Sequence, residues 1–454
     1  MNTITLTMTR HEPFSYKSSA ELLKKSEDLG LKLPFQESIN LLFEKVTLGS
    51  RKLPNRMAVQ PMEGFDAESD GSPSELTFRR YCRYGRGGSS LIWFEATSVV
   101  QEGRSNPHQL MITSHNVDDF KRLVEKTRSS ASSMFRSQHE IFLVLQLTHS
   151  GRYSQPERKP KPKVACINHF LDEQGGNAQV ISDEELEQLQ EKYVDSARLA
   201  GEAGFDAVDI KACHGYLIND LLAAFTRDKS RYGGSFQNRT FFLREVVDKI
   251  RSVVPGIILA VRLNAYDGIV YPYGFGVRKD GSLSVDLTEP KSLIRKLIRL
   301  GCSLFNVTAG NPFLKPHLGR PFDRPHFKAS LPEEHPLEGV SRLLNIAGEL
   351  QKEFPGIPFV GTGYSWLRHF FPNVAAAVVR RRGASFIGLG RSSFAYPDAV
   401  RDLMNTNSID PKKVCITCSR CSHLMRHGFV SGCAVRDREV YGKEYRKLLR
   451  NIKR

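Results

Sequence analysis

The chain has 454 residues, 40% of them hydrophobic, and is therefore long enough to bury a sizeable core. No stretch approaches the roughly 18 uncharged apolar residues of a membrane span, and the first residues lack the pattern of a secretory signal, so we expect a soluble, cytoplasmic protein with no membrane partner. The net charge is +16, and residues 411–454, with 12 lysines and arginines against 3 carboxylates, carry +9 of it.

Residues 1–40 are predicted to form an N-terminal extension, with a short helix over residues 20–29. Beyond it, short apolar runs rich in β-branched and aromatic residues recur along the chain, which is typical of buried parallel strands. These runs are Met57–Gln60, Ser90–Phe94, Phe142–Leu147, Ala207–Ile210, Ile257–Leu263, Leu304–Val307, Ile357–Val360 and Ser385–Leu389.

Helical patterns separate these runs, and the clearest helix begins at Ser182. Ser182 and Glu185 have capping-box spacing, because each side chain can accept a hydrogen bond from the other's backbone N–H. The helix is expected to end near Gly201–Gly204. Alternation of eight strands with helices favours a (β/α)8 TIM barrel, an α/β fold, over residues 41–405, followed by a cysteine-rich tail at 406–454.

Polar side chains and glycines gather where the predicted strands end, which is where such a barrel builds its active site. In chain order the main ones are Glu63, Glu95, Gln146, His149, Lys211, His214, Arg262, Asn264, Thr308, Thr362, Gly363, Gly390 and Arg391. The last glycines follow strands seven and eight, where barrels bind phosphate through backbone N–H groups. Gly363, Gly390 and Arg391 are therefore predicted to hold a phosphate, to which the arginine fork is suited.

Four of the eight cysteines cluster near the C-terminus, as Cys415-x2-Cys418-x2-Cys421-x11-Cys433. In a cytosolic chain such clustering favours metal binding over disulfides. Thiolates at this density repel one another unless a cation neutralises them. The spacing alone permits either a zinc site or a [4Fe–4S] cluster.

Six segments form a distinctive set. They are KLPNRMAVQPMEG (52–64), LQLTHSGR (145–152), AGFDAVDIKACHGYLINDLL (203–222), TRDKSRYGGSFQNR (226–239), VRLN (261–264) and FIGLGRSSFAYPD (386–398). Together they resemble the Old Yellow Enzyme family of FMN-dependent NADH:flavin oxidoreductases. They are most similar to the branch that includes 2,4-dienoyl-CoA reductase and bile-acid enoate reductases, and the resemblance extends from about residue 40 to Cys433.

The resemblance implies a site for FMN in the barrel. Backbone at Pro61, Met62 and Ala96 would line the flavin ring, and Gln146 would bond its pyrimidine edge. Arg262 would lie beside flavin N1/O2, where a positive charge stabilises the anionic reduced flavin. The predicted phosphate would be that of FMN.

The resemblance also implies catalytic roles. In the family a hydride passes from flavin N5 to the β-carbon of an activated alkene, and a tyrosine protonates the α-carbon; Tyr216 matches that tyrosine. Where many relatives carry a His/His or His/Asn pair for the substrate carbonyl, this chain has Lys211 and His214, and the lysine either polarises the carbonyl or forms an ion pair. His317 lies in the loop where the branch uses a histidine, and is either that residue or a surface one.

Glu63 departs from the family pattern, which often has Thr or Cys next to flavin O4/N5. An ionised carboxylate there would disfavour a negatively charged hydroquinone. We hypothesise that a desolvated carboxyl at Glu63 shares a proton with the flavin.

The same branch holds a [4Fe–4S] cluster on a cysteine segment with the same eleven-residue gap, although this chain has one residue fewer between its second and third cysteines. We therefore favour [4Fe–4S] over zinc. The long relatives continue into FAD and NAD(P)H domains, whereas this chain ends at Arg454. Electrons are expected either from NAD(P)H directly at the FMN or from a separate acidic carrier protein that docks on the basic tail.

The leading hypothesis is an FMN and iron–sulfur reductase of an activated C=C bond in a small-molecule enone, enoate or enoyl thioester. A second hypothesis, with the same cofactors, is an amine dehydrogenase or demethylase. A third is a zinc-stabilised, non-catalytic barrel associated with nucleic acid. The tail has no nucleic-acid motif and no aromatic interleaving for base stacking, so we favour a solvated, partly helical tail and expect no nucleic-acid partner. The oligomeric state is open, a homo-oligomer included.

Overall fold

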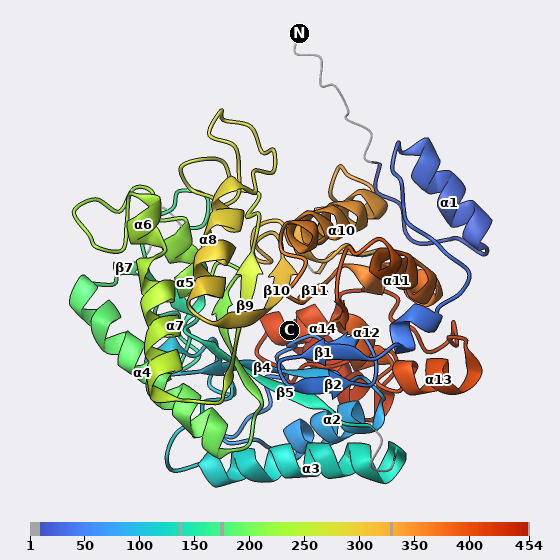
Figure 1. Cartoon of the computed structure of the whole chain (residues 1–454), viewed down its shortest axis with the longest axis horizontal. Helices are drawn as coiled ribbons and strands as arrows, with labels where there is room; N and C mark the ends of the chain where they lie inside the picture. Colours follow the sequence, from blue (N-terminus) through green and yellow to red (C-terminus); the bar gives the residue numbers. More distant parts are fainter. Residues whose placement is uncertain (1–9, 136–138, 173–176, 327–329, 453–454) are drawn as a thin grey trace.

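A computed structural model describes residues 10–135, 139–172, 177–326 and 330–452. Its centre is a closed barrel of parallel strands in the order β10-β11-β12-β3-β4-β5-β8-β9 (Figure 1). The strands are β3 (Met57–Val59), β4 (Leu91–Ser98), β5 (Phe142–Thr148), β8 (Ala207–Ala212), β9 (Ile258–Asn264), β10 (Cys302–Thr308), β11 (Phe359–Gly361) and β12 (Phe386–Leu389). Each predicted apolar run overlaps one of these strands, so the predicted (β/α)8 barrel is confirmed.

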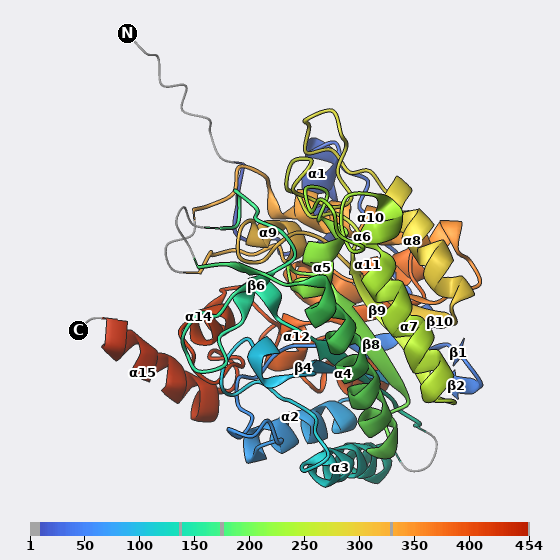
Figure 2. The same cartoon turned by 90° about the vertical axis from the view of Figure 1, so that its left-hand side faces the viewer.

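Helices surround the barrel (Figures 1 and 2). The longer ones are α2 (Glu75–Arg86), α3 (Val117–Phe135), α4 (Asp183–Glu202), α7 (Phe241–Val253), α8 (Thr288–Arg299), α10 (Pro336–Glu353), α11 (Phe371–Arg380) and α13 (Ala399–Thr406). Short ones follow the strand ends: α5 (Leu217–Leu222), α6 (Phe236–Arg239), α9 (Pro316–Gly319) and α12 (Arg391–Ala395). Helix α4 begins as predicted, because Ser182 and Glu185 form the reciprocal capping box.

The N-terminal half of the barrel is filled by apolar side chains. Leu91, Phe142 and Ala207, each the first residue of its strand, belong to one buried layer. The hairpin of β1 (Val46–Leu48) and β2 (Arg51–Leu53) closes this end, since Leu48 and Leu53 pack into the same layer. The opposite end, where the strands finish, is therefore the end left for polar side chains.

The N-terminal extension packs against the outside of the barrel. Its helix α1 (Ser19–Asp28), which confirms the helix predicted over residues 20–29, lies near α10 and α11 (Figure 1). Phe14 and Leu22 share a buried cluster with Val340 of α10 and Val374 of α11. Within the described parts of the chain, no helix is both long and apolar enough to cross a membrane.

The tail is partly helical, as predicted. It contains α14 (Arg420–Arg426) and α15 (Lys443–Ile452), and α15 extends away from the barrel in Figure 2. Leu424, Tyr441 and Leu448 form a small buried cluster that joins the two helices. Two further short strands, β6 (Lys163–Val164) and β7 (Gln179–Val180), pair with each other outside the barrel.

Candidate active site

The C-terminal ends of the barrel strands surround a cavity that helix α14 of the tail also lines. Most of the predicted site residues contribute to its wall: Pro61, Met62, Glu63, Lys211, His214, Tyr216, Arg262, Gly363, Gly390, Arg391 and Cys421. This end of a TIM barrel is where catalytic residues from different strands meet. The fold therefore brings the predicted flavin, substrate and cysteine positions to one cavity.

Glu63 connects the two side chains expected to act on the substrate. Its Oε1 accepts a hydrogen bond from the Tyr216 hydroxyl at 3.1 Å and lies 3.5 Å from Lys211 Nζ. Its Oε2 accepts a hydrogen bond from the Ser105 hydroxyl at 3.1 Å. Lys211 Nζ also lies 3.5 Å from the centre of the Tyr216 ring. Of the two alternatives that the sequence left for Lys211, the structure contains the ion pair.

Burial governs the ionisation of these groups. Desolvation raises the pKa of Tyr216 well above its ordinary value, and the neighbouring Glu63 raises it further. Desolvation lowers the pKa of Lys211, while Glu63 opposes that change. Desolvation, with the charges of Arg262 and Lys211, lowers the pKa of His214 well below its ordinary value. Tyr216 therefore keeps its hydroxyl proton near neutral pH, and His214 is uncharged there.

Three residues predicted to contact flavin or substrate do not line the cavity. Gln146 is buried, and its Nε2 donates to Asp209 Oδ2 at 2.6 Å. Ala96 is buried in β4. His317 lies in α9 with its Nε2 3.9 Å from Glu334 Oε1. The structure gives these residues partners or packing within the protein, and their roles toward flavin or substrate stay predictions.

The polar residues that line the cavity and were not predicted include Gln60, Arg320 and Arg426. Gln60 directly follows strand β3 and precedes Pro61, so the strand-end argument that selected Glu63 could have found it. Arg320 follows α9, and Arg426 is the last residue of α14. A single arginine in a loop or tail has no periodicity or spacing that would mark it, so only the fold identifies these two.

Buried hydrogen-bond donors in the cavity indicate that it receives a polar ligand. Gln60 Nε2, Arg262 Nε and Arg391 Nη1 are buried and have no partner among the described residues. Such unmatched donors are costly in a folded protein unless a ligand or water satisfies them. The polar edge of a flavin and its phosphate both supply hydrogen-bond acceptors.

Two glycines keep the same part of the cavity open. A side chain at Gly388 would collide with the amide of Gln60. Gly363, which follows β11, has a φ of 104°, a conformation that other residues rarely adopt. These glycines leave room at the predicted phosphate and flavin positions, and the unmatched donors supply hydrogen bonds there. The residues present therefore fit FMN.

The four clustered cysteines line a second, smaller cavity next to the first. All four are free thiols. The N–H of Thr417 donates to Cys415 Sγ and the N–H of Arg436 donates to Cys433 Sγ, each at 3.4 Å. Across the described residues, no three His, Cys, Asp or Glu side chains are arranged to hold a single metal ion. The thiols thus face one void but are not drawn together around one point.

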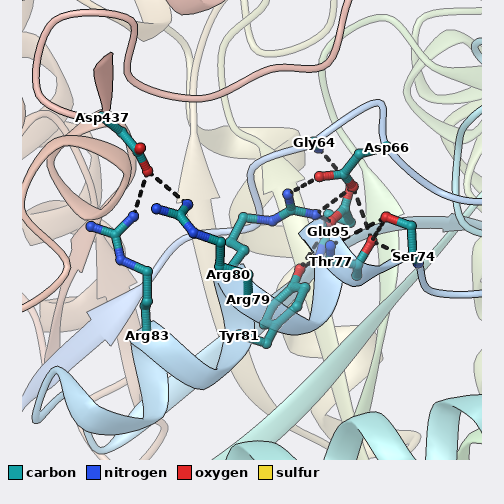
Figure 3. Close-up of polar contacts among 10 residues, drawn as sticks. All are labelled: Gly64, Asp66, Ser74, Thr77, Arg79, Arg80, Tyr81, Arg83, Glu95 and Asp437. Carbon is teal, nitrogen blue, oxygen red and sulfur yellow. Dashed lines mark hydrogen bonds and ion pairs between the residues drawn. The ribbon is translucent and has the colours of Figure 1, made fainter. Parts of the chain in front are cut away.

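Ion pairs with α2 hold the tail on the barrel (Figure 3). Arg79 Nη1 and Arg83 Nη1 each lie 2.7 Å from Asp437 Oδ2. Asp437 follows Cys433 closely, and its N–H donates to the Cys433 carbonyl at 2.9 Å. The cysteine segment is therefore anchored to a barrel helix through one carboxylate.

The loop that carries Glu63 is attached to both α2 and the tail. Arg80 Nη2 lies 2.5 Å from Glu95 Oε1, and Glu95 Oε2 accepts the Gly64 N–H at 2.7 Å (Figure 3). The carbonyl of Gly64 accepts the Ser431 N–H at 2.6 Å. The position of Glu63 is thereby coupled to a buried ion pair and to the segment between Cys421 and Cys433.

Comparison with known proteins gives the family. The model of the NADH:flavin oxidoreductase / NADH oxidase family matches residues 41–274, more than half of the chain. The NADPH dehydrogenase of Bacillus subtilis (strain 168) is 31% identical over 229 residues, which are 50% of this chain and 64% of that protein. The match thus spans less than two thirds of that relative's length.

Solved structures with low sequence identity share the fold. A complex of 2-naphthoyl-CoA reductase with 2-naphthoyl-CoA has a TM-score of 0.70 at 19% identity and covers 90% of this chain and 58% of that one. Histamine dehydrogenase from Rhizobium sp. 4-9 has a TM-score of 0.67 at 20% identity and covers 87% and 52%. With the matching family model and the parallel barrel, these similarities lead to one conclusion: the chain belongs to the NADH:flavin oxidoreductase / NADH oxidase family.

Proposed function

We propose that this chain is an FMN-dependent oxidoreductase that reduces an activated C=C bond in a small-molecule enone, enoate or enoyl thioester. The observation that supports this reaction most is the Tyr216 hydroxyl, which is buried in the cavity wall and bonded to Glu63 at 3.1 Å. Reduction of C=C requires a hydride equivalent at one carbon and a proton at the other. The protonated Tyr216 is suited to deliver that proton.

The residues that would hold FMN come from several strand ends. Pro61 and Met62 would lie against the ring, and Gln60 and Arg262 would donate to its polar edge. The phosphate would be held at Gly363, Gly390 and Arg391. When bound, FMN supplies the hydride equivalent, and NAD(P)H, named by relatives such as the NADPH dehydrogenase, is the proposed source of the electrons.

The chain's own residues would bind the activating group and supply the proton. Lys211 Nζ has three N–H donors, and one ion pair with Glu63 leaves others to polarise a substrate carbonyl. The Tyr216 hydroxyl gives its proton to the α-carbon while the β-carbon receives the hydride equivalent, and the phenolate regains a proton from solvent. Glu63 and Ser105 fix the hydroxyl before transfer, because Glu63 Oε2 is itself bonded to Ser105.

An anaerobic half-reaction tests this proposal. The FMN-loaded protein is reduced with dithionite, freed of excess reductant, and mixed with cyclohexenone while the flavin spectrum is followed. We expect reoxidation of the flavin and formation of cyclohexanone. A reduced flavin that stays reduced with enones, enoates and enoyl thioesters would contradict alkene reduction.

The alternative of amine oxidation rests on the shared fold with histamine dehydrogenase. It requires that the cavity bind a positively charged amine. A cationic amine is disfavoured where the wall is cationic, and apart from Glu63 the described charged side chains of this cavity are lysine and arginine. Glu63 is the carboxylate in the cavity wall, and its Oε1 is already engaged by Lys211 and Tyr216. We therefore favour alkene reduction, and expect that histamine and trimethylamine leave the oxidised flavin spectrum unchanged.

The cysteine cavity is proposed to hold a [4Fe–4S] cluster on Cys415, Cys418, Cys421 and Cys433. Cys421 lines both cavities, so it would place the cluster beside the flavin site.

Membership of a flavin oxidoreductase family supports an enzyme over the non-catalytic, zinc-stabilised barrel associated with nucleic acid. The positive charge of residues 411–454 supports electron delivery by an acidic carrier protein, and reduction by a flavodoxin that showed no dependence on ionic strength would contradict such docking.

A further inference from the structure

The charges that line the active-site cavity are mostly positive. Its cationic side chains are Lys211, Arg262, Arg320, Arg391 and Arg426. Lys211 is paired with Glu63. Asp209 lies near Arg262: its charge favours the protonated guanidinium, and its Oδ1 accepts the backbone N–H of Arg262 at 2.5 Å. Two of these cations therefore have anionic partners on the chain itself.

Two more cations lie where the proposed cofactors bring negative charge. Arg320 Nη1 donates to the hydroxyl of Ser422, the residue after the proposed cluster ligand Cys421. Arg391 belongs to the proposed phosphate site. These considerations leave Arg426 without an assigned counter-charge.

Arg426 is held in a fixed orientation on the side of the cavity near Tyr216. Its Nη2 donates to the Pro312 carbonyl, and its guanidinium lies 4.8 Å from the centre of the Phe313 ring. Phe313 in turn stacks on Tyr153, with ring centres 3.6 Å apart. The Tyr153 ring lies next to that of Tyr216, with ring centres 6.0 Å apart. The stack thus connects Arg426 to the proposed proton donor.

Among the described residues, no carboxylate is a cause of the pKa shift of Arg426. Its Nε is buried without a hydrogen-bond partner. Burial lowers the pKa of this arginine. Arg426 is half-buried and lines the cavity. A partly desolvated cation without a counter-ion is costly, so the position is suited to a ligand that brings negative charge.

We infer that the substrate carries a free carboxylate, and that Arg426 binds it. This inference rests on the proposed function, because it concerns the substrate of the same cavity. A single guanidinium matches a carboxylate through parallel N–H···O bonds. Its neighbours Phe313, Met425 and Pro312 are apolar and supply a surface for a carbon skeleton, whereas the phosphate position lies at Gly363, Gly390 and Arg391.

A binding experiment on the FMN-loaded full chain tests this inference without requiring turnover. The affinities of cyclohexanecarboxylate and its neutral isostere cyclohexanecarboxamide are measured by calorimetry for the wild type, Arg426→Gln, Arg426→Lys and Arg446→Gln. Arg446 is exposed on α15, so the control makes the same charge change elsewhere in the tail. Flavin content and circular dichroism verify that each variant is folded.

The wild type and Arg446→Gln should bind the carboxylate at least roughly 30-fold more tightly than the amide, since removing one partner of a desolvated ion pair typically costs that much. Arg426→Gln should lose this preference, and Arg426→Lys should keep part of it. A wild type without the preference, or an Arg426→Gln variant that retains it, would overturn the inference. If the carboxylate binds as expected but no alkene is reduced, the proposed reaction fails and the anion site stands.

Discussion

At the residue scale, the structure makes Glu63 the centre of the proposed chemistry. Its carboxylate accepts a hydrogen bond from the Tyr216 hydroxyl and pairs with Lys211. The hypothesis that Glu63 shares a proton with the flavin stays a prediction. What the geometry adds is that Glu63 controls two other groups, namely the direction of the Tyr216 hydroxyl and the charge of Lys211.

The variant Tyr216→Phe should lose the proposed proton donor while keeping the ring. We expect kcat for enone reduction to fall by roughly 10²- to 10⁴-fold, the usual contribution of a positioned general acid, with unchanged FMN content. The measurement is steady-state turnover with product analysis. Tyr266→Phe is the matched control, because the Tyr266 hydroxyl donates to the Leu283 carbonyl at 2.7 Å, in a contact that does not involve the cavity. Wild-type turnover in Tyr216→Phe would remove this residue from the mechanism.

The variant Glu63→Gln should change the pH dependence of the reaction. The negative charge of Glu63 raises the pKa of Lys211 against the effect of burial. Removing that charge lowers the Lys211 pKa further, so the protonated lysine is lost at a lower pH. The alkaline limb of the kcat/KM profile should therefore move to lower pH. Glu68 is an exposed residue of the same loop, and Glu68→Gln should leave the alkaline limb at its wild-type pH. An alkaline limb at the same pH in wild type and Glu63→Gln would refute the coupling of Glu63 to Lys211.

At the element scale, helix α10 begins with a histidine cap. His335 Nδ1 accepts the Leu337 N–H at 3.1 Å, and Glu338 Oε2 accepts the His335 N–H at 2.7 Å. His335 Nε2 lies 3.3 Å from the Tyr16 hydroxyl and 3.8 Å from Glu12 Oε2. Burial is the main cause that lowers the pKa of His335 to about 4. The cap therefore works with a neutral imidazole and ties the N-terminal extension to the barrel.

This cap predicts a loss of stability in acid. The unfolded histidine titrates near ~6.5, and the folded one near 4, so the unfolded chain binds more protons between those values. The free energy of unfolding should therefore fall as pH drops through this window, by up to about 1.4 kcal/mol per pH unit from this residue. His335→Asn keeps a good cap without a titrating group. Urea unfolding should show a shallower acid dependence in the variant, and parallel curves would contradict the assignment.

The attachment of the tail to α2 predicts that loss of the Asp437 charge loosens the tail but not the barrel. Asp437→Asn removes the charge that both Arg79 and Arg83 contact. We expect faster hydrogen exchange of backbone amides in residues 430–452, by roughly tenfold or more, because a shared ion pair is lost. Exchange in the barrel strands should not change. Glu439→Gln is an exposed control in the same segment, and equal exchange in both variants would show that Asp437 does not hold the tail.

At the scale of the whole molecule, the sequence was sufficient to predict the barrel, because buried parallel strands appear in a sequence as continuous apolar runs. It also located Lys211 and Arg262 at strand ends, which the closed barrel brings to one cavity, and the resemblance added Tyr216. Side-chain pairing could not be predicted in the same way. The contact of Lys211 with Glu63 joins residues 148 positions apart, and Gln146 bonds Asp209 across neighbouring strands.

The entry of the tail into the active site also depends on tertiary structure. The basic composition of residues 411–454 predicted a solvated surface, and most of its cations carry no local signal of another role. Arg426 lines the cavity only because α14 packs over the strand ends. The cysteine spacing predicted a metal or cluster site, but not that Cys421 would line the same cavity as Tyr216.

The cofactor content of the purified protein tests the account most directly. Anaerobic purification should give a coloured protein in which one FMN accompanies about four iron atoms and four acid-labile sulfides per chain, with a broad visible absorbance beneath the flavin bands. Replacement of Cys421 by serine should remove iron and sulfide while most FMN remains. A colourless protein that contains zinc but neither flavin nor iron would contradict the proposed enzyme, its electron route and the assignment of the cavity at the barrel mouth.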